Sequence, residues 1–199
     1  MLIKASTITN LTDARYFAAK EVNFLGFCLE EGAEGYLDPI YMKAMREWVE
    51  GPKIVGEFEQ TPARTVLEAA RFFGLDAVQL RRSDDLEVLD GLEVILAVPG
   101  ASDPASLAPL LEKTAPHVRF FLLDFSEIEN AAAVLKNQAA AWKNLFTRFP
   151  ALLDLQVAAA ALPDLLNDLQ PAGLALRGGE EERVGVKSFD EIDLIFDAL

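Results

Sequence analysis

Short apolar segments alternate with longer amphipathic segments along the whole chain. An apolar segment without polar alternation is typical of a strand covered on both faces, as in a parallel sheet. Eight segments rich in Val, Ile, Leu or Phe have this character: Leu2–Ser6, Phe24–Cys28, Lys53–Phe58, Ala77–Leu80, Leu92–Val98, Val118–Leu123, Leu152–Val157 and Gly173–Leu176. We interpret them as buried strands.

The amphipathic segments between these strands predict helices. Thr61-Pro62 and Asp103-Pro104 each place a capping residue before a proline, which is a common helix start. Ser126-Glu127-Ile128-Glu129 has the capping-box pattern, and a long Ala-rich periodic segment follows it. The predicted helices are Asp13–Glu21, Asp38–Glu50, Ala63–Phe73, Pro104–Lys113, Glu127–Phe149, Pro163–Leu169 and Ser188–Ala198.

Strands that alternate with helices form a parallel sheet, which either closes into a barrel or stays open and doubly wound. Eight strand–helix units favour closure, so we expect the α/β class and a single (β/α)8 TIM barrel. The chain has 199 residues, near the small end for that fold. No linker, low-complexity tract or charge block divides it, which predicts one domain over residues 1–199.

The charge of the chain argues against two classes of partner. Asp and Glu outnumber Lys and Arg by 32 to 18, for a formal charge of −14. Nucleic acids and anionic membrane surfaces are bound by clustered Lys and Arg, so we expect neither as a partner. No basic segment with a long apolar run marks a leader, and no run approaches the ~20 residues of a membrane helix. With Cys28 as the single cysteine, no intrachain disulfide is possible, and the expected compartment is the cytoplasm.

Several short segments, spread over the whole length of the chain, form a recognisable series. The most specific is Leu75-Asp76-Ala77-Val78-Gln79-Leu80, and the others are Lys4 with Ile8-Thr9, Asp13-Ala14, Leu25-Gly26-Phe27, Leu122-Leu123-Asp124 and Gly185-Val186-Lys187. In this order the segments resemble the phosphoribosylanthranilate isomerase family.

This resemblance implies an eight-stranded barrel and an Amadori rearrangement in tryptophan biosynthesis, without metal or cofactor. In the family, a cysteine on the first strand is the general base and an aspartate on the sixth strand is the general acid. Backbone amides of glycine loops after the seventh and eighth strands hold the substrate phosphate. By position, Asp124 corresponds to the acid, and Ser6 stands where the family has its base.

Three features of the chain depart from the family pattern. A serine hydroxyl such as that of Ser6 is no base near neutral pH without help, and loss of general-base catalysis lowers a rate by about 10²–10⁴. Ala160 and Ala161 replace the phosphate-loop glycines, and their methyl groups obstruct close approach of the backbone to an anion. The glycine loop after the sixth strand is replaced by 126–129, which we predict to be helical.

Other residues are candidates for binding a small phosphorylated or carboxylated ligand. Arg81, with Arg82, follows the fourth strand and either binds an anion or pairs with nearby Asp84 and Asp85. Arg177, Gly178 and Gly179 follow the eighth strand and either offer amide and guanidinium donors or form an ordinary turn. The candidate ligand-binding residues are Arg81, Arg177, Gly178 and Gly179.

Further residues carry open alternatives. Asp124 is either an acid or a cap of the following helix. Lys4 is expected inside the barrel near Asp124, where the two would form a stabilising ion pair. Cys28 is either a buried small apolar residue or a relocated base. His117 precedes the sixth strand, so we expect it at the end of the barrel away from the active site.

The sequence leaves three hypotheses about function. We favour a barrel of this family whose isomerase activity is lost or altered, because three parts of one site differ together. The alternative is an active isomerase with Asp124 as acid and Ser6 in the base position. A third hypothesis is an enzyme for another anionic substrate that uses Asp124, with Arg81 or Arg177 as the clamp for the anion.

Overall fold

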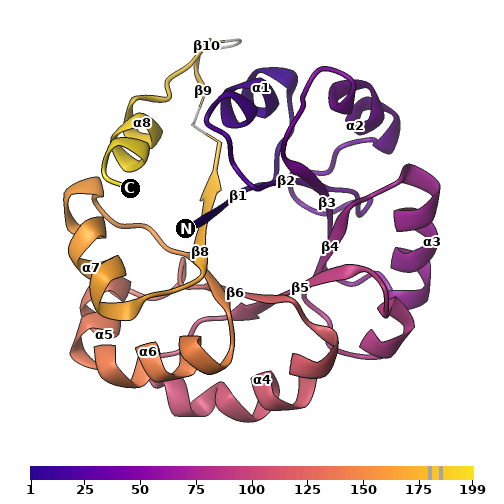
Figure 1. Cartoon of the computed structure of the whole chain (residues 1–199). Helices are drawn as coiled ribbons and strands as arrows, with labels where there is room; N and C mark the ends of the chain where they lie inside the picture. The colour runs from indigo at the N-terminus through magenta and orange to yellow at the C-terminus, as the bar shows by residue number, and fades with distance from the viewer. Residues whose placement is uncertain (179–180, 184–185) are drawn as a thin grey trace.

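Eight parallel strands form a closed barrel in sequence order (Figure 1). The computed structural model describes residues 1–178, 181–183 and 186–199. The barrel strands are β1 (Leu2–Ser6), β2 (Phe24–Cys28), β3 (Lys53–Phe58), β4 (Ala77–Leu80), β5 (Glu93–Pro99), β6 (Phe120–Asp124), β7 (Ala151–Asp154) and β8 (Gly173–Arg177). The predicted TIM barrel is confirmed.

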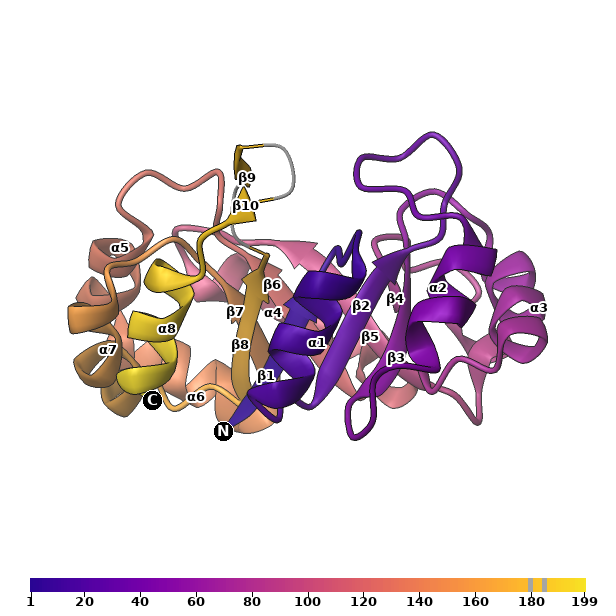
Figure 2. The ribbon, with the colours of Figure 1, turned by 90° about the horizontal axis from the view of Figure 1, so that it is seen from above.

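The register of the barrel brings the carboxyl ends of the strands to one edge. β1 closes the ring against β8 with Ser6 opposite Arg177, and β6 lies against β7 with Asp124 opposite Asp154. Figure 2 shows this edge uppermost, with the loop between β2 and α2 rising above it. A short antiparallel pair, β9 (Glu181–Arg183) and β10 (Val186–Lys187), also rises there.

Helices surround the barrel and cover its outer face. Between strands and helices lies an apolar core that includes Phe17, Leu25 and Trp142. A second apolar cluster fills the barrel interior and includes Phe24, Ile95 and Phe120. The helices are α1 (Leu11–Ala19), α2 (Pro39–Arg46), α3 (Ala63–Phe73), α4 (Ala108–Thr114), α5 (Ala131–Asn137), α6 (Ala139–Arg148), α7 (Leu162–Leu169) and α8 (Asp190–Asp197). None of the described helices is both long and apolar enough to cross a membrane.

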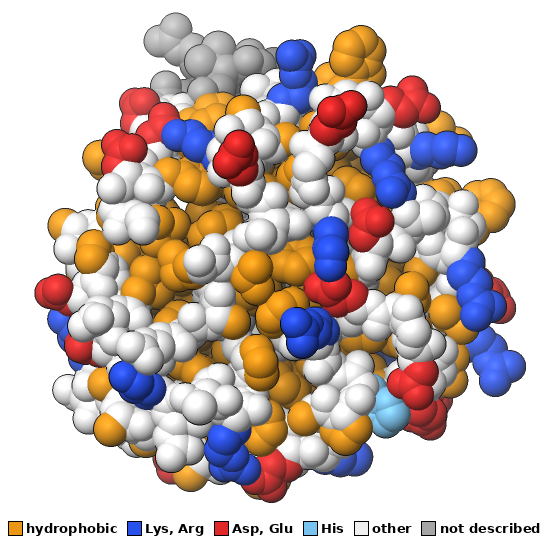
Figure 3. All heavy atoms as spheres, in the orientation of Figure 1, with side chains coloured by type: hydrophobic (Ala, Val, Ile, Leu, Met, Phe, Trp, Pro, Cys, Tyr) orange, Lys and Arg blue, Asp and Glu red, His pale blue; other side chains and the backbone are white. Residues whose placement is uncertain are grey.

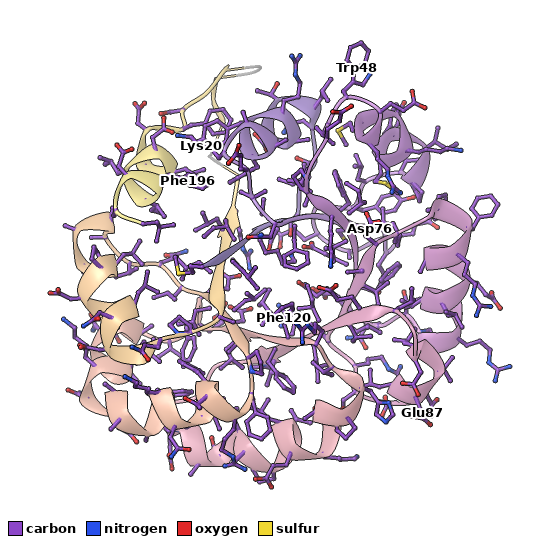
Figure 4. The ribbon with its side chains drawn as sticks, in the orientation of Figure 1. Lys20, Trp48, Asp76, Glu87, Phe120 and Phe196 are labelled. Carbon is purple, nitrogen blue, oxygen red and sulfur yellow. The ribbon has the colours of Figure 1, made fainter. Side chains whose placement is uncertain are left out.

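The last helix is held against the first by polar and aromatic contacts. The Tyr16 ring stacks on Phe189 with ring centroids 3.9 Å apart, and its hydroxyl donates to Asp193 at 2.7 Å. Lys20 pairs with the same Asp193 carboxylate at 2.6 Å and lies 5.2 Å from the Phe196 ring centroid (Figure 4). These contacts join the two ends of the helix ring.

The longest predicted helix is wrong in its extent. The expected helix Glu127–Phe149 is two helices, α5 and α6, and residues 126–130 form turns before α5. Asn130 has a positive φ of 54°, which stops a helix from extending back through it. The Ser126 hydroxyl and amide both donate to Asp124, so Ser126 does not cap a helix.

Candidate functional site

A polar cleft of about 490 Å³ opens at the edge where the strands end. It brings together five of the predicted site residues: Ser6, Arg81, Asp124, Arg177 and Gly178. Gly179 lies outside the described residues. These residues come from strands far apart in the sequence, and the parallel barrel places them around one mouth.

Asp124 is fixed as a carboxylate by three donors. Its Oδ1 accepts from the Ser126 amide at 3.0 Å and from the Ser126 hydroxyl at 2.5 Å, and its Oδ2 accepts from Arg81 at 3.0 Å. Burial alone would raise the pKa of Asp124, but the Ser126 hydrogen bonds and the Arg81 charge outweigh it and lower the pKa. Asp124 is therefore ionised at neutral pH.

Ser6 is held by a buried ion pair. The Lys4 ammonium donates to Ser6 Oγ at 2.8 Å and forms an ion pair with Glu57. The Lys4 side chain is fully buried and that of Glu57 is 8% exposed. The predicted ion pair between Lys4 and Asp124 is wrong. Lys4 pairs with Glu57, and Asp124 pairs with Arg81.

The backbone around Glu57 is shaped to admit its carboxylate. A Cβ on Gly26 of β2 would overlap Glu57 Oε1 and lie 2.7 Å from Lys4 Nζ, so glycine is required beside the pair. Thr7 has a positive φ of 53°. Its amide and hydroxyl donate to Glu57 Oε2, both at 3.1 Å, which stabilises this uncommon conformation.

Asp154 and Arg177 form a second arginine–carboxylate pair, and Asp154 was not among the residues predicted from the sequence. Arg177 Nη2 lies 3.2 Å from Asp154 Oδ2. Burial raises the pKa of Asp154, opposed by the Arg177 charge and reinforced by the Asp124 carboxylate. The predicted strand Leu152–Val157 placed Asp154 inside the strand, whereas β7 ends at this residue. The repeated Leu-Leu-Asp at 122–124 and 152–154 is the signal that would have found it.

Glu57 is the other functional candidate that sequence analysis missed. It is the only acidic residue in the apolar strand Lys-Ile-Val-Gly-Glu-Phe of β3. A charged residue in a strand that is otherwise buried is itself a signal, because a buried charge requires a partner.

The loops expected to hold a phosphate are unfavourable here. Ala159–Ala161 form a single helical turn before α7, and the Ala161 amide already donates to the Ala158 carbonyl at 2.9 Å. At Gly178 the backbone comes close to a carboxylate, since a Cβ there would lie 2.6 Å from Asp13 Oδ2. An anion near Gly178 would meet the negative charge of Asp13.

The remaining candidates have structural partners. Burial raises the pKa of the Cys28 thiol, despite its contact with the Glu30 carbonyl, so Cys28 lines the cleft as a neutral thiol. His117 lies before β6, 2.8 Å from Asp90, away from the cleft as expected. Arg82 pairs with Asp84 at 2.8 Å, as one of the two alternatives predicted.

A larger hollow of about 760 Å³ lies at the opposite mouth of the barrel. This face is seen in Figure 3, where apolar side chains fill much of the centre, and Phe120 is labelled there in Figure 4. Lys53 lies over the Phe24 ring and pairs with Glu93, and Arg119 lies over the Phe120 ring. Active sites of such barrels lie at the other end, so the smaller cleft is the candidate site. Among the described residues, no group of three or more His, Cys, Asp or Glu could hold a metal ion.

Comparisons with known proteins agree with this architecture. A family model described as N-(5'phosphoribosyl)anthranilate (PRA) isomerase matches residues 3–198. An N-(5'-phosphoribosyl)anthranilate isomerase from Maridesulfovibrio salexigens is 24% identical over 204 residues, covering 100% of this chain and 98% of the relative.

Solved structures of known proteins have a similar fold. Phosphoribosyl anthranilate isomerase from Thermus thermophilus has a TM-score of 0.76 and 27% identity, with 100% of this chain and 98% of that chain covered. A phosphoribosyl anthranilate isomerase in complex with reduced 1-(o-carboxyphenylamino)-1-deoxyribulose 5-phosphate has a TM-score of 0.75 and 20% identity, with the same coverage.

Proposed function

The chain belongs to the N-(5'-phosphoribosyl)anthranilate isomerase family, and on that premise we propose that its isomerase activity is lost or altered while its cleft still binds a small ligand. The observation that carries this proposal is the state of Asp124. A general acid must hold a proton at the working pH. Asp124 instead accepts three hydrogen bonds that favour its ionised form.

The group in the base position is equally unsuited to proton transfer. Ser6 accepts a hydrogen bond from the Lys4 ammonium, and Glu57 neutralises that ammonium as its ion-pair partner. Nothing in this arrangement takes a proton from the serine hydroxyl. A charged lysine is a donor only, so it holds Ser6 Oγ in place without making it a base.

The ligand we propose is a small phosphorylated or carboxylated molecule. Arg81 and Arg177 present their guanidinium groups at the mouth of the cleft, with side chains 38% and 58% exposed. Guanidinium groups bind phosphates and carboxylates through paired hydrogen bonds. The compound named for one structural relative carries both a phosphate and a carboxyphenyl group.

A second candidate is an active isomerase that uses Asp124 as acid and Ser6 in the base position. The observation that favours it is that both residues line the same cleft, at the tips of β1 and β6. This candidate predicts that the gene restores growth of a tryptophan auxotroph that lacks the isomerase.

Direct turnover separates the two candidates. We expect the purified chain to convert phosphoribosylanthranilate at least about 10²–10⁴ times more slowly than an active isomerase, because general-base catalysis alone contributes that much. The measurement is kcat/KM, with the Thermus thermophilus relative assayed in parallel. A value within tenfold of the relative's, abolished by Asp124→Asn, would contradict the proposal and establish the active isomerase.

A further inference from the structure

The carboxylates of the two arginine–carboxylate pairs at the mouth differ in how many hydrogen bonds they accept. Asp124 has both oxygens occupied by three donors, whereas Asp154 accepts, among the described residues, only from Arg177, through Oδ2 at 3.2 Å. In the part of the chain that the structure describes, no donor forms a hydrogen bond with Asp154 Oδ1. Asp154 thus holds Arg177 through a single contact, and Arg177 is the more exposed of the two arginines.

The surroundings of Asp154 oppose its ionised form. Its side chain is only 13% exposed. The charged groups that act on it are Arg177 from β8, Asp124 from β6 and Lys4 from β1. Lys4, which is paired with Glu57, lowers the pKa of Asp154 less than Arg177 does. The carboxylates of Asp124 and Glu57 both act on Arg177 as well. Arg177 therefore interacts electrostatically with the carboxylates of Asp154, Asp124 and Glu57.

We propose that Asp154 competes with an anionic ligand for Arg177, and that the ligand binds when Asp154 takes up a proton and releases the guanidinium. This inference rests on the proposed function, since it concerns the anionic ligand of the same cleft. The proton comes from solvent, one for each anion bound. Asp154 is then the residue that determines when the cleft accepts an anion.

The sign of the pH dependence follows from the competition. Ionised Asp154 holds Arg177, and protonated Asp154 does not, so the affinity for an anion rises as the pH falls. One linked proton changes the affinity by at most about tenfold per pH unit. Because the pKa of Asp154 is raised and that of Asp124 is lowered, Asp154 titrates first and Asp124 stays paired with Arg81.

Sulfate is the probe that tests this, because it remains a dianion throughout the range used. Titration of the full chain by calorimetry at pH 7.5, 6.5 and 5.5 is expected to show affinity rising toward low pH. Asp154→Asn is expected to bind sulfate at pH 7.5 at least as tightly as the unsubstituted chain does at pH 5.5, with a change below about twofold across the range. Arg177→Gln is expected to lose binding.

The exposed pair Arg82–Asp84, at 2.8 Å, supplies the matched control. Asp84→Asn frees an arginine outside the cleft and is expected to leave the sulfate affinity and its pH dependence unchanged. Calorimetry of the unsubstituted chain in two buffers of different ionisation heat counts the proton taken up, and this readout stands even if Asp154→Asn does not fold.

Two results would overturn the inference. Absence of sulfate binding to the unsubstituted chain and to folded Asp154→Asn at every pH would show that the cleft takes no anion at Arg177. Equal affinity at every pH with no proton uptake would show that Asp154 does not compete. Neither result bears on turnover of phosphoribosylanthranilate, which tests the loss of isomerase activity separately.

Discussion

Replacing Glu57 with leucine is expected to lower the free energy of unfolding by about 3–5 kcal/mol, because it leaves the Lys4 ammonium buried without a counter-charge. Lys4 is fully buried, and its polar partners among the described residues are Glu57 and Ser6. The substitution also removes the acceptor of the Thr7 amide and hydroxyl. Denaturant unfolding measures the effect as a shift of the transition midpoint.

The double variant Lys4→Met with Glu57→Leu separates the lost charge pair from lost packing. We expect it to recover the part of the loss that comes from the unpaired Lys4 charge, since apolar residues of similar volume replace a buried ion pair with little penalty. The Thr7 amide and hydroxyl stay without their Glu57 acceptor in both variants. Lys53→Met, in the exposed pair with Glu93, is the control and is expected to change stability by less than about 1 kcal/mol. If Glu57→Leu lowers the free energy of unfolding by no more than Lys53→Met does, the buried Lys4–Glu57 pair does not stabilise the fold.

The strands were predictable because burial on both faces leaves an apolar signal in the local sequence. The first four match the structure residue for residue, since polar residues, glycine or proline follow them closely. At β7 the apolar pattern continues past Asp154 through Leu155 and Val157. The strand nevertheless ends at Asp154, because its pairing with β6 and β8 ends at that residue, and a local sequence pattern carries no information about pairing. The helix predicted from Glu127 failed because Ser126 bonds to Asp124 instead of capping.

The site was predictable as a set of positions but not as a set of partners. A parallel barrel brings every strand end to one mouth, so Ser6 and Asp124 were expected to meet there. Which side chains touch depends on the stagger between non-adjacent strands. Lys4 of β1 reaches Glu57 of β3, and Arg81 after β4 reaches Asp124 of β6. No sequence spacing encodes these pairs, and they decide which groups are charged.

Ser6→Cys is expected to create a reactive thiolate and to raise the turnover of phosphoribosylanthranilate by roughly 10²-fold, the lower range for general-base catalysis. The Lys4 ammonium lies 2.8 Å from Ser6 Oγ, and a neighbouring ammonium lowers the pKa of a thiol. Cys28 is an internal reference, because burial raises the pKa of its thiol. At pH 7 an alkylating reagent should therefore modify the introduced thiol well before Cys28, as mass spectrometry of the peptides would show.

The thiol readout makes the turnover result interpretable. Lys4→Met in the Ser6→Cys background should slow alkylation and lower turnover together, if the ammonium is what ionises the thiol. The gain is expected to stop short of an active relative because Asp124 remains ionised by Arg81 and Ser126. A thiol at position 6 that is as unreactive as Cys28 would contradict the electrostatic argument. A reactive thiol without any gain in turnover would place the defect in the acid and the phosphate loop. Asp124 is ionised, whereas a general acid must hold a proton, and Ala159–Ala161 stand where the family has its glycine loop.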